Sequence, residues 1–475
     1  MELKGKRTLV MGLGLHDGGL GVTRFLVEQG AEVTVTDLRS AEVLRPTLEK
    51  LAGLPINYVL GEHREEDFRQ AELVIKNPAV PREAGLLRLA QQAGASIEME
   101  LTLFFKLCPS PFILGITGTR GKTTTTLLAG AMFKAWQADT VVAGNLRVSA
   151  LAKLAEIGPH TPVILELSSW QLEGLGEQQL SPPYAVVTNL SPDHLNRYCD
   201  MEDYAQAKRN IYRWQKGAAA VVVLNLDDPL VSRFAEDAPQ RVSWFSTQPL
   251  PVGKNGAYLH EGNLIWRDPA KPEIEQVIVP ATTLKVPGQH NLQNALAAIS
   301  LARLAGCPLE CIRTGLENFK GLPDRLELVR EVDGIRFYND TTATSPAGVV
   351  AALEALRSVS RSEERRIILI AGGADKQLDF TPMARAIANP INRVAHLVLL
   401  DGTATPRLVM ALEDAGVSAS KLAWPFDDFS EAIATAQALA KKDDLVLLSP
   451  GCASFGMFTH EFERGEQFRE IVGKL

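Results

Sequence analysis

The stretch ILGITGTRGKTTTT, residues 113–126, decides the fold class of this chain. It begins with an apolar run typical of a buried strand, continues through a glycine-rich turn, and enters a threonine-rich helical pattern at Lys122. A strand that runs into a helix through glycines presents backbone amides at the helix start, so the turn predicts a site for phosphate oxygens. The spacing GxxGKT is shorter than the common GxxxxGKT. The interpretation as a phosphate site therefore depends on the strand that precedes the turn and the helix that follows it.

Four residues of this turn suit a nucleoside triphosphate. Gly118 and Gly121 let backbone amides approach phosphate oxygens closely, because neither carries a Cβ atom. Lys122 supplies a cation for the outer phosphates, and Thr123 can offer its hydroxyl to Mg²⁺. The sequence therefore predicts that a nucleoside triphosphate binds here together with magnesium.

Short apolar runs alternate with helical patterns on both sides of this turn. This alternation favours parallel sheets covered by helices, so we expect an α/β protein. Prolines near Cys108 and the segment GLPDRLE near Gly321 mark two boundaries. They predict three domains, at residues 1–106, 107–320 and 321–475. From Val242 onward, turn residues between short apolar runs predict antiparallel strands inserted in the second domain.

Composition excludes several classes of protein. The chain has 475 residues, with 49 basic and 56 acidic residues and a net charge of −7, so a nucleic-acid partner is not expected. Its five cysteines are scattered and contain no CxxC pair, which argues against a disulfide framework and a structural zinc site. No apolar run reaches the roughly 20 residues of a membrane span, and the first residues lack a signal-peptide pattern. We expect a cytoplasmic protein with no membrane partner.

Acidic or histidine residues follow two of the predicted strands. Glu166 ends the strand in VILELSSW and could ligate a metal shared with a triphosphate, although strand-end glutamates are often simply solvated. Asp193 and His194 follow another strand, where a loop that caps the next helix is an equal alternative.

Two helical patterns carry further candidates. Lys208 lies in YAQAKRNIY, and an exposed helix lysine is the default interpretation from the sequence alone. Asn291 and Asn294 lie one helical turn apart in PGQHNLQNALAA and face the same way. Such a pair can bracket a purine edge or cap the helix, and both alternatives stay open.

The amino-terminal segment GLGLHDGGLG, residues 12–21, resembles a dinucleotide loop but breaks its spacing. Gly12 and Gly14 fit the pattern, whereas Asp17 stands where a glycine is expected. Asp37, at the end of the next predicted strand, could contact a ribose. An NAD-dependent oxidoreductase is therefore an alternative, and a nucleotide sensor without catalytic activity is another.

Three motifs taken together, TGTRGKTTTT, ELSSWQLEGL and LSPGCASFGMF, resemble the Mur ligase family, and the resemblance covers essentially the whole chain. It implies a Rossmann-like UDP-binding domain, a P-loop-type ATPase domain and a Rossmann-like carboxy-terminal domain. It also implies an ATP- and Mg²⁺-dependent ligase that adds glutamate, in the D form, to UDP-N-acetylmuramoyl-L-alanine through an acyl phosphate, in peptidoglycan precursor synthesis. A monomer is expected. A ligase of the same family with another amino-acid preference, or one that extends a folate, remains an alternative.

The resemblance also implies roles for individual residues. Those that contact ATP are Gly118, Thr119, Gly121, Lys122, Thr123, Thr124, Asn291, Asn294, Arg325 and Asp340. Those that contact the UDP substrate or glutamate are Asp37, Arg39, Asn77, Asn145, Ser168, Thr344, Lys376 and Ser454. The metal ligands are Thr123, Glu166, His194 and Lys208, the last as a carbamate formed with CO₂. The catalytic set is Lys122, Glu166, His194 and Lys208.

Three departures from the family pattern affect substrate contacts. Thr342 stands in NDTTAT where the family often has a lysine, and Glu461 stands in THEFERG where the family often has an aromatic residue. Both changes make the expected amino-acid pocket less positive. The loop GLGLHDGGLG is longer than usual, which bears on the contact with UDP.

Overall fold

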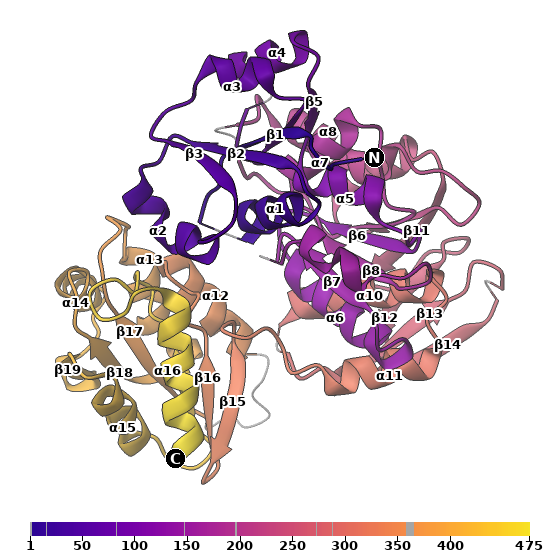
Figure 1. The fold of residues 1–475 in the computed structure, drawn as a ribbon. Helices are drawn as coiled ribbons and strands as arrows, with labels where there is room; N and C mark the ends of the chain where they lie inside the picture. The colour runs from indigo at the N-terminus through magenta and orange to yellow at the C-terminus, as the bar shows by residue number, and fades with distance from the viewer. Residues whose placement is uncertain are drawn as a thin grey trace. The chain divides into compact units, whose positions relative to one another are not determined.

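A computed structural model describes residues 2–15, 17–81, 83–146, 148–194, 197–271, 273–286, 288–357 and 365–475. The chain divides into two compact units, one formed by Met1–Thr283 and Leu292–Asn318, the other by Leu284–Asn291 and Phe319–Leu475. Each unit is built from parallel-rich sheets covered by helices (Figure 1), which confirms the expected α/β class. Within the described ranges, no helix combines the length and apolar character that crossing a membrane requires.

The first unit begins with a five-stranded parallel sheet in the order β3-β2-β1-β4-β5. Its strands are β1 (Arg7–Met11), β2 (Glu32–Asp37), β3 (Ile56–Leu60), β4 (Leu73–Lys76) and β5 (Ser96–Glu98), and its helices are α1 (Asp17–Glu28), α2 (Ala41–Lys50), α3 (Glu65–Gln70) and α4 (Gly85–Gln92). Both faces are buried because side chains alternate along each strand: Val10 of β1 joins one core, while Leu9 and Met11 pack with Phe68 of α3 and Leu87 of α4 in another.

A nine-stranded sheet forms the rest of the first unit, in the order β14-β13-β12-β11-β10-β9-β6-β8-β7. Its strands are β6 (Ile113–Thr117), β7 (Val141–Gly144), β8 (Val163–Glu166), β9 (Tyr184–Val187), β10 (Val221–Asn225), β11 (Arg241–Ser246), β12 (Gly256–His260), β13 (Asn263–Arg267) and β14 (Glu275–Pro280). Its helices are α5 (Glu100–Leu107), α6 (Lys122–Trp136), η1 (Leu151–Glu156), α7 (Ser169–Glu177), α8 (Met201–Arg213), α9 (Pro229–Ser232), η2 (Arg233–Glu236), η3 (Ala281–Thr283), α10 (Gln289–Leu304) and α11 (Leu309–Asn318).

The antiparallel insertion expected from Val242 is only partly correct. Strands β12, β13 and β14 pair antiparallel, but β11 pairs parallel with both β10 and β12. The last four residues of β11, Ser243–Ser246, are buried, so this strand continues the covered parallel sheet instead of forming a solvated hairpin.

The second unit holds a six-stranded sheet in the order β15-β16-β20-β17-β18-β19. Its strands are β15 (Glu327–Val332), β16 (Ile335–Asn339), β17 (Ile367–Gly372), β18 (Val394–Leu400), β19 (Leu422–Phe426) and β20 (Leu445–Leu448), and its helices are α12 (Pro346–Arg357), α13 (Thr381–Ala388), η4 (Pro390–Asn392), α14 (Thr405–Asp414), η5 (Ala419–Lys421), α15 (Phe429–Leu439) and α16 (Glu461–Lys474). On β17, Leu369 joins the core under α12, α13 and α14, while Ile368 and Ile370 join the core under α15 and α16. The alternation places helices on both faces of this sheet.

Candidate active site

The predicted phosphate loop joins β6 to α6 and depends on glycine at two positions. Gly118 has a φ of +149° and Gly121 a φ of +80°, both in the region that favours glycine. A Cβ atom at Gly118 would lie 1.8 Å from Thr188 Oγ1, and one at Gly121 would lie 2.2 Å from Asn294 Oδ1. Any larger residue would therefore displace the loop from its neighbours.

The end of strand β9 holds this loop in place. The backbone amide of Thr119 donates to the carbonyl of Asn189 over 3.0 Å, and the amide of Arg120 donates to Asn189 Oδ1 over 2.8 Å. Thr188 Oγ1 donates to the carbonyl of Arg120 over 2.7 Å. Thr188 and Asn189 were not among the predicted site residues, although their place directly after an apolar strand in VVTNLS was a usable signal.

The start of helix α6 places a cation beside the loop. Lys122 Nζ lies 3.1 Å from the carbonyl oxygen of Gly118 and 3.0 Å from that of Thr119. Thr123 is half-buried and Thr124 is buried in the same first turn. The positive end of the helix dipole and the Lys122 charge therefore act on the same small volume.

Lys208 is buried, which contradicts the default interpretation of an exposed helix lysine. Only 1% of the residue is exposed, and its amine donates to the carbonyl of Gly118 over 2.9 Å. Helix α8 turns Tyr204, Ala205 and Ile211 toward the core, and Lys208 shares that face, because positions three and four apart lie together. The amine also lies 4.6 Å from the ring centroid of Tyr204.

The surroundings of Lys208 disfavour its charged form. Burial lowers the pKa of this amine well below its ordinary value, and the nearby Lys122 cation lowers it further, while Asp193 opposes the change. A lysine in this setting holds more neutral amine near pH 7 than an exposed lysine does.

Glu166 and Asn145 meet beside the phosphate loop at the carboxyl edge of the sheet. Glu166 ends β8, is only 2% exposed, and accepts a 2.8 Å hydrogen bond from Asn145 Nδ2 at its Oε1 atom. Its second oxygen, Oε2, is buried and has no hydrogen-bond partner among the described residues. A buried carboxylate oxygen without a donor fits a metal ligand, because such an oxygen otherwise bears an unrelieved desolvation cost.

His194 follows β9 in an unusual backbone conformation. Its φ is +54°, and its own amide donates to Asp193 Oδ1 over 2.9 Å. The imidazole contacts the rings of Trp170 and Tyr204, with centroids 5.3 and 6.3 Å away. Within the described ranges, no group of three acidic, histidine or cysteine side chains is close enough to hold a metal unaided. Metal binding by Glu166 and His194 would need further oxygen ligands.

Ser168 has a local structural role in the fold. It is the N-cap of α7, and its hydroxyl accepts a hydrogen bond from the amide of Gln171 over 3.2 Å. In turn, the backbone amide of Ser168 donates to Gln171 Oε1 over 2.9 Å. This capping box accounts for the residue without a substrate. Its contact with substrate stays a prediction from the family resemblance.

The residues predicted to bind UDP gather around the glycine loop of the first sheet. Asp37 accepts hydrogen bonds from the amides of Gly14 and Arg39, over 3.1 and 2.9 Å. Asn77 donates to the carbonyl of Gly12 over 3.2 Å. These residues lie at the carboxyl ends of β1, β2 and β4, where open α/β sheets bind ligands. His16, within the longer loop, lies outside the described residues.

The second unit brings the predicted glutamate contacts together. Lys376 Nζ donates to Thr344 Oγ1 over 3.0 Å. Ala374 and Ala453 exchange backbone hydrogen bonds of 2.9 and 3.1 Å, which brings the segment of Lys376 beside buried Ser454. Thr342 donates to the carbonyl of Asp324 over 2.9 Å, and Glu461 is half-buried at the first position of α16.

Asp340 is a buried carboxylate in the same unit. Its oxygens accept from Ser449 Oγ over 2.8 Å and from the amide of Leu326 over 3.1 Å. Burial raises the pKa of Asp340 to about 7, although both hydrogen bonds and the exposed Arg325 act in the opposite direction.

The two asparagines predicted to contact ATP lie on helix α10. Asn294 is buried beside Gly121, with its Oδ1 atom 3.4 Å from Thr125 Oγ1. Asn291 is also buried.

Comparison with known proteins identifies the family. Residues 6–98 match a Mur ligase MurD-like N-terminal domain, residues 116–302 a Mur ligase middle domain, and residues 324–452 a Mur ligase glutamate ligase domain. A UDP-N-acetylmuramoylalanine--D-glutamate ligase of Roseiflexus sp. (strain RS-1) is 52% identical, covering 99% of both chains. The chain belongs to the Mur ligase family. A relative with the same name from Symbiobacterium thermophilum is 38% identical to this Mur ligase, over 99% of this chain and 98% of the relative.

Solved structures of other Mur ligases share the fold. UDP-N-acetylmuramate-alanine ligase MurC from Thermotoga maritima aligns with a TM-score of 0.59 at 21% identity, covering 98% of this chain and 99% of that one. MurF from Acinetobacter baumannii aligns with a TM-score of 0.59 at 18% identity, covering 99% and 94%. The three expected Mur ligase domains are therefore confirmed. Family membership favours the ligase over the NAD-dependent oxidoreductase and over the nucleotide sensor.

Proposed function

We propose that this Mur ligase joins glutamate, in its D form, to UDP-N-acetylmuramoyl-L-alanine at the expense of ATP. The observation that carries this proposal is the 52% identity, over 99% of both chains, to a ligase named for that reaction. The chemistry is amide formation between a carboxylate and an amine, in the synthesis of peptidoglycan precursors. ATP and Mg²⁺ are the cofactors typical of the family.

The reaction begins with activation of a poor electrophile. A carboxylate oxygen of the UDP substrate attacks the γ-phosphorus of ATP, the bond to the β-phosphate oxygen breaks, and an acyl phosphate forms with release of ADP. The glutamate amine then adds to the acyl carbon, and the tetrahedral intermediate collapses to amide and inorganic phosphate while the amine loses its proton. Negative charge on the moving phosphoryl group is the charge that the protein must stabilise.

We propose that Lys122 and the backbone amides in the first turn of α6 supply that stabilisation. Lys122 already lies within 3.1 Å of two loop carbonyls, so it is positioned over the volume that the phosphates would enter. Fixed donors at this place require no rearrangement when charge develops, which is the physical basis of their catalytic effect. We propose that Gly118, Thr119, Gly121 and Thr124 also contact ATP. Asn291, Asn294, Arg325 and Asp340 are further proposed ATP contacts.

Glu166, Thr123 and His194 are the residues that we propose to hold magnesium. The unpartnered buried oxygen of Glu166 supports this assignment. When bound, Mg²⁺ would neutralise phosphate charge and polarise the transferring group. The contribution of the chain is to orient Glu166 through the hydrogen bond from Asn145 to Oε1 and to leave Oε2 without a donor among the described residues.

Lys208 is proposed to act as a carbamate. A buried amine with a lowered pKa is a good nucleophile toward CO₂: its nitrogen forms a bond to the carbon, and a proton leaves. The product is an anionic oxygen ligand in place of a cation that would repel Mg²⁺ beside Lys122. The burial of Lys208 beside Gly118 supports this proposal.

The residues proposed to bind the UDP substrate and those proposed to bind glutamate belong to different units of the chain. Asp37, Arg39 and Asn77 are proposed to bind the uridine nucleotide, with Asn145 and Ser168 nearer the reacting carboxylate. Lys376, Thr344 and Ser454 are proposed to bind glutamate, because an ammonium and two hydroxyls suit its carboxylates. We also propose domain boundaries at residues 106/107 and 320/321, a monomer, and a cytoplasmic location.

One assay tests the proposed function. Phosphate release should require ATP, Mg²⁺, UDP-N-acetylmuramoyl-L-alanine and D-glutamate together, and the product should contain an alkali-stable amide. L-glutamate, other amino acids and a folate acceptor are the matched alternatives. Efficient turnover with any of these and none with D-glutamate would contradict the substrate assignment while leaving the family in place.

A further inference from the structure

The left-handed backbone conformation of His194 must be stabilised by neighbouring residues. A non-glycine residue at φ +54° persists only where the surroundings hold it. Its carbonyl oxygen accepts two backbone hydrogen bonds, from the amide of Arg197 over 2.9 Å and from that of Tyr198 over 3.1 Å. The conformation of His194 therefore depends on where Arg197 and Tyr198 are anchored.

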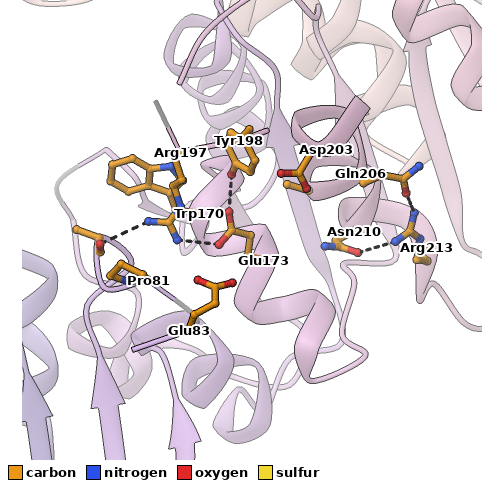
Figure 2. A pocket seen from close by; sticks show the side chains of 12 residues that line it. Pro81, Glu83, Trp170, Glu173, Arg197, Tyr198, Asp203, Gln206, Asn210 and Arg213 are labelled. Atoms are coloured by element: carbon orange, nitrogen blue, oxygen red, sulfur yellow. Dashed lines mark hydrogen bonds and ion pairs between the residues drawn. The ribbon is translucent and has the colours of Figure 1, made fainter. Parts of the chain in front are cut away.

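Arg197 is anchored by an aromatic ring and a carboxylate. Its guanidinium carbon lies 4.7 Å from the centroid of the Trp170 ring, and its Nη2 atom lies 2.8 Å from Glu173 Oε2. Trp170 is the same ring that contacts the His194 imidazole, at 5.3 Å and an interplanar angle of 55°. Figure 2 shows Arg197 beside Trp170 with the ion pair to Glu173 drawn.

Glu173 ties the neighbouring tyrosine into the same cluster. Its side chain is 4% exposed, and its Oε1 atom accepts from Tyr198 Oη over 2.6 Å. Burial, and then the hydrogen bond to Glu173, raise the pKa of Tyr198 well above its ordinary value, so this phenol stays a donor. Both residues that hold the His194 carbonyl thus have their side chains fixed on one buried carboxylate.

Arg197 also reaches the first sheet of its unit. Its Nη1 atom lies 3.4 Å from the carbonyl oxygen of Ala79, in the segment after β4 that carries Asn77. The Arg197 side chain is 17% exposed and borders a cavity of about 560 Å³, whose lining also includes Arg213 of α8. Arg213, in contrast, forms hydrogen bonds with Gln206 and Asn210, both within its own helix.

We propose that Arg197 is a positioning residue that sets the orientation of the His194 imidazole through Trp170 and through the backbone of His194. The proposal rests on the function proposed for His194 and deepens it. A planar guanidinium can stack on an indole and pair with a carboxylate at once, whereas a lysine ammonium has no planar face to stack and presents one compact charge. Small displacements of a side chain that positions the reactants lower turnover strongly, so the effect should appear in kcat.

The first experiment compares Arg197→Met and Arg197→Lys with Arg213→Met, a control on the same cavity. We expect kcat to fall about 10- to 100-fold in Arg197→Met, with KM for ATP within about twofold of wild type, because the phosphate loop is untouched. Arg197→Lys should recover only part of the loss. Arg213→Met should match wild type. Equal kcat in Arg197→Met and Arg213→Met would overturn the proposal.

A structural readout separates positioning from loss of fold. With ¹⁵N-labelled histidine, the ring resonances of His194, assigned by their absence in His194→Ala, should shift in Arg197→Met and Arg197→Lys but not in Arg213→Met. Unfolding midpoints are measured for all variants. Should Arg197→Met fail to fold, the shift in folded Arg197→Lys decides, and unchanged His194 resonances there would overturn the proposal.

A double-mutant cycle distinguishes this proposal from the proposed function itself. If Arg197 acts through His194, Arg197→Met should have little further effect on kcat in a His194→Ala background, since the two losses are not additive. Full additivity would overturn the proposal. A fully active His194→Ala enzyme would instead remove the role of His194, and with it the function on which this inference rests.

Discussion

The amine of Lys208 donates a 2.9 Å hydrogen bond to the carbonyl oxygen of Gly118, across 90 residues of sequence. This contact places a buried lysine at the first glycine of the phosphate loop, near the Lys122 cation. Two ammonium groups this close repel each other. Burial and this repulsion therefore favour an uncharged amine at Lys208.

Lys208→Ala should be inactive, because a carbamate at this position would supply an oxygen ligand that alanine cannot. A small carboxylate such as formate in the buffer should restore part of the activity by occupying the vacated volume. A metal-bound crystal should show extra density on Nζ of wild-type Lys208. Exposed Lys216→Ala is the control and should keep full activity. Normal turnover by Lys208→Ala would show that this lysine has only a structural role.

Lys122→Ala should lower kcat by several orders of magnitude while the fold survives. Loss of a fixed donor to developing charge costs about 2.7–4 kcal/mol in comparable sites, and Lys122 carries a full charge. Steady-state phosphate release measures the effect, and circular dichroism checks the fold. Lys134→Ala, an exposed lysine on the same helix, should be unaffected. A near-normal rate in Lys122→Ala would remove the phosphate loop from the catalytic site.

The amino-acid pocket is predicted to be less positive than in a typical family member. Thr342→Lys should lower KM for glutamate, since a charged hydrogen bond contributes about 1.5–3 kcal/mol. Glu461→Phe should act in the same direction if the half-buried carboxylate faces the substrate. KM is measured for D- and L-glutamate in wild type and both variants. The altered-pocket idea fails if wild type already prefers D-glutamate strongly and neither variant lowers KM.

Stability should depend on pH through Asp340. Its pKa is about 7 in the fold against an ordinary 3.8, so between these values the folded chain keeps a proton that the unfolded chain has lost. Stability from this group is therefore fully present below about pH 4 and decreases as pH rises to about 7. Asp340→Asn, which cannot ionise, should gain stability relative to wild type over that range, by a few kcal/mol at most at about 1.4 kcal/mol per pKa unit.

Urea unfolding midpoints from about pH 3 to 8.5 measure this difference. Asp375→Asn is the control with the opposite sign, because the hydrogen bond from Arg407 lowers the pKa of Asp375. Removing that carboxylate should cost stability at neutral pH, and the cost should vanish as pH falls below about 4. A constant difference between Asp340→Asn and wild type across the range would mean that Asp340 is already ionised in the fold.

The sequence by itself determined the features whose parts are adjacent along the chain. Residues 113–126 hold the strand, both glycines, the lysine and the helix start in one continuous stretch, so the phosphate loop could be predicted locally. Alternating apolar runs predicted the α/β class for the same reason. The roles of Asp340, Lys376 and Ser454 came only from family resemblance, because no local pattern marks them.

Only the tertiary structure decided which distant residues meet. Strand β6 lies between β8 and β9, neither of which precedes it along the chain, and this order brings the ends of β8 and β9 to the loop, while the pairing of β8 with β7 brings Glu166 to Asn145. It also decided that Lys208 is buried. The physical reason is that burial and partner depend on sheet order, which hydrogen bonds between non-consecutive strands establish. The sequence of helix α8 alone does not tell whether Lys208 faces solvent or the phosphate loop.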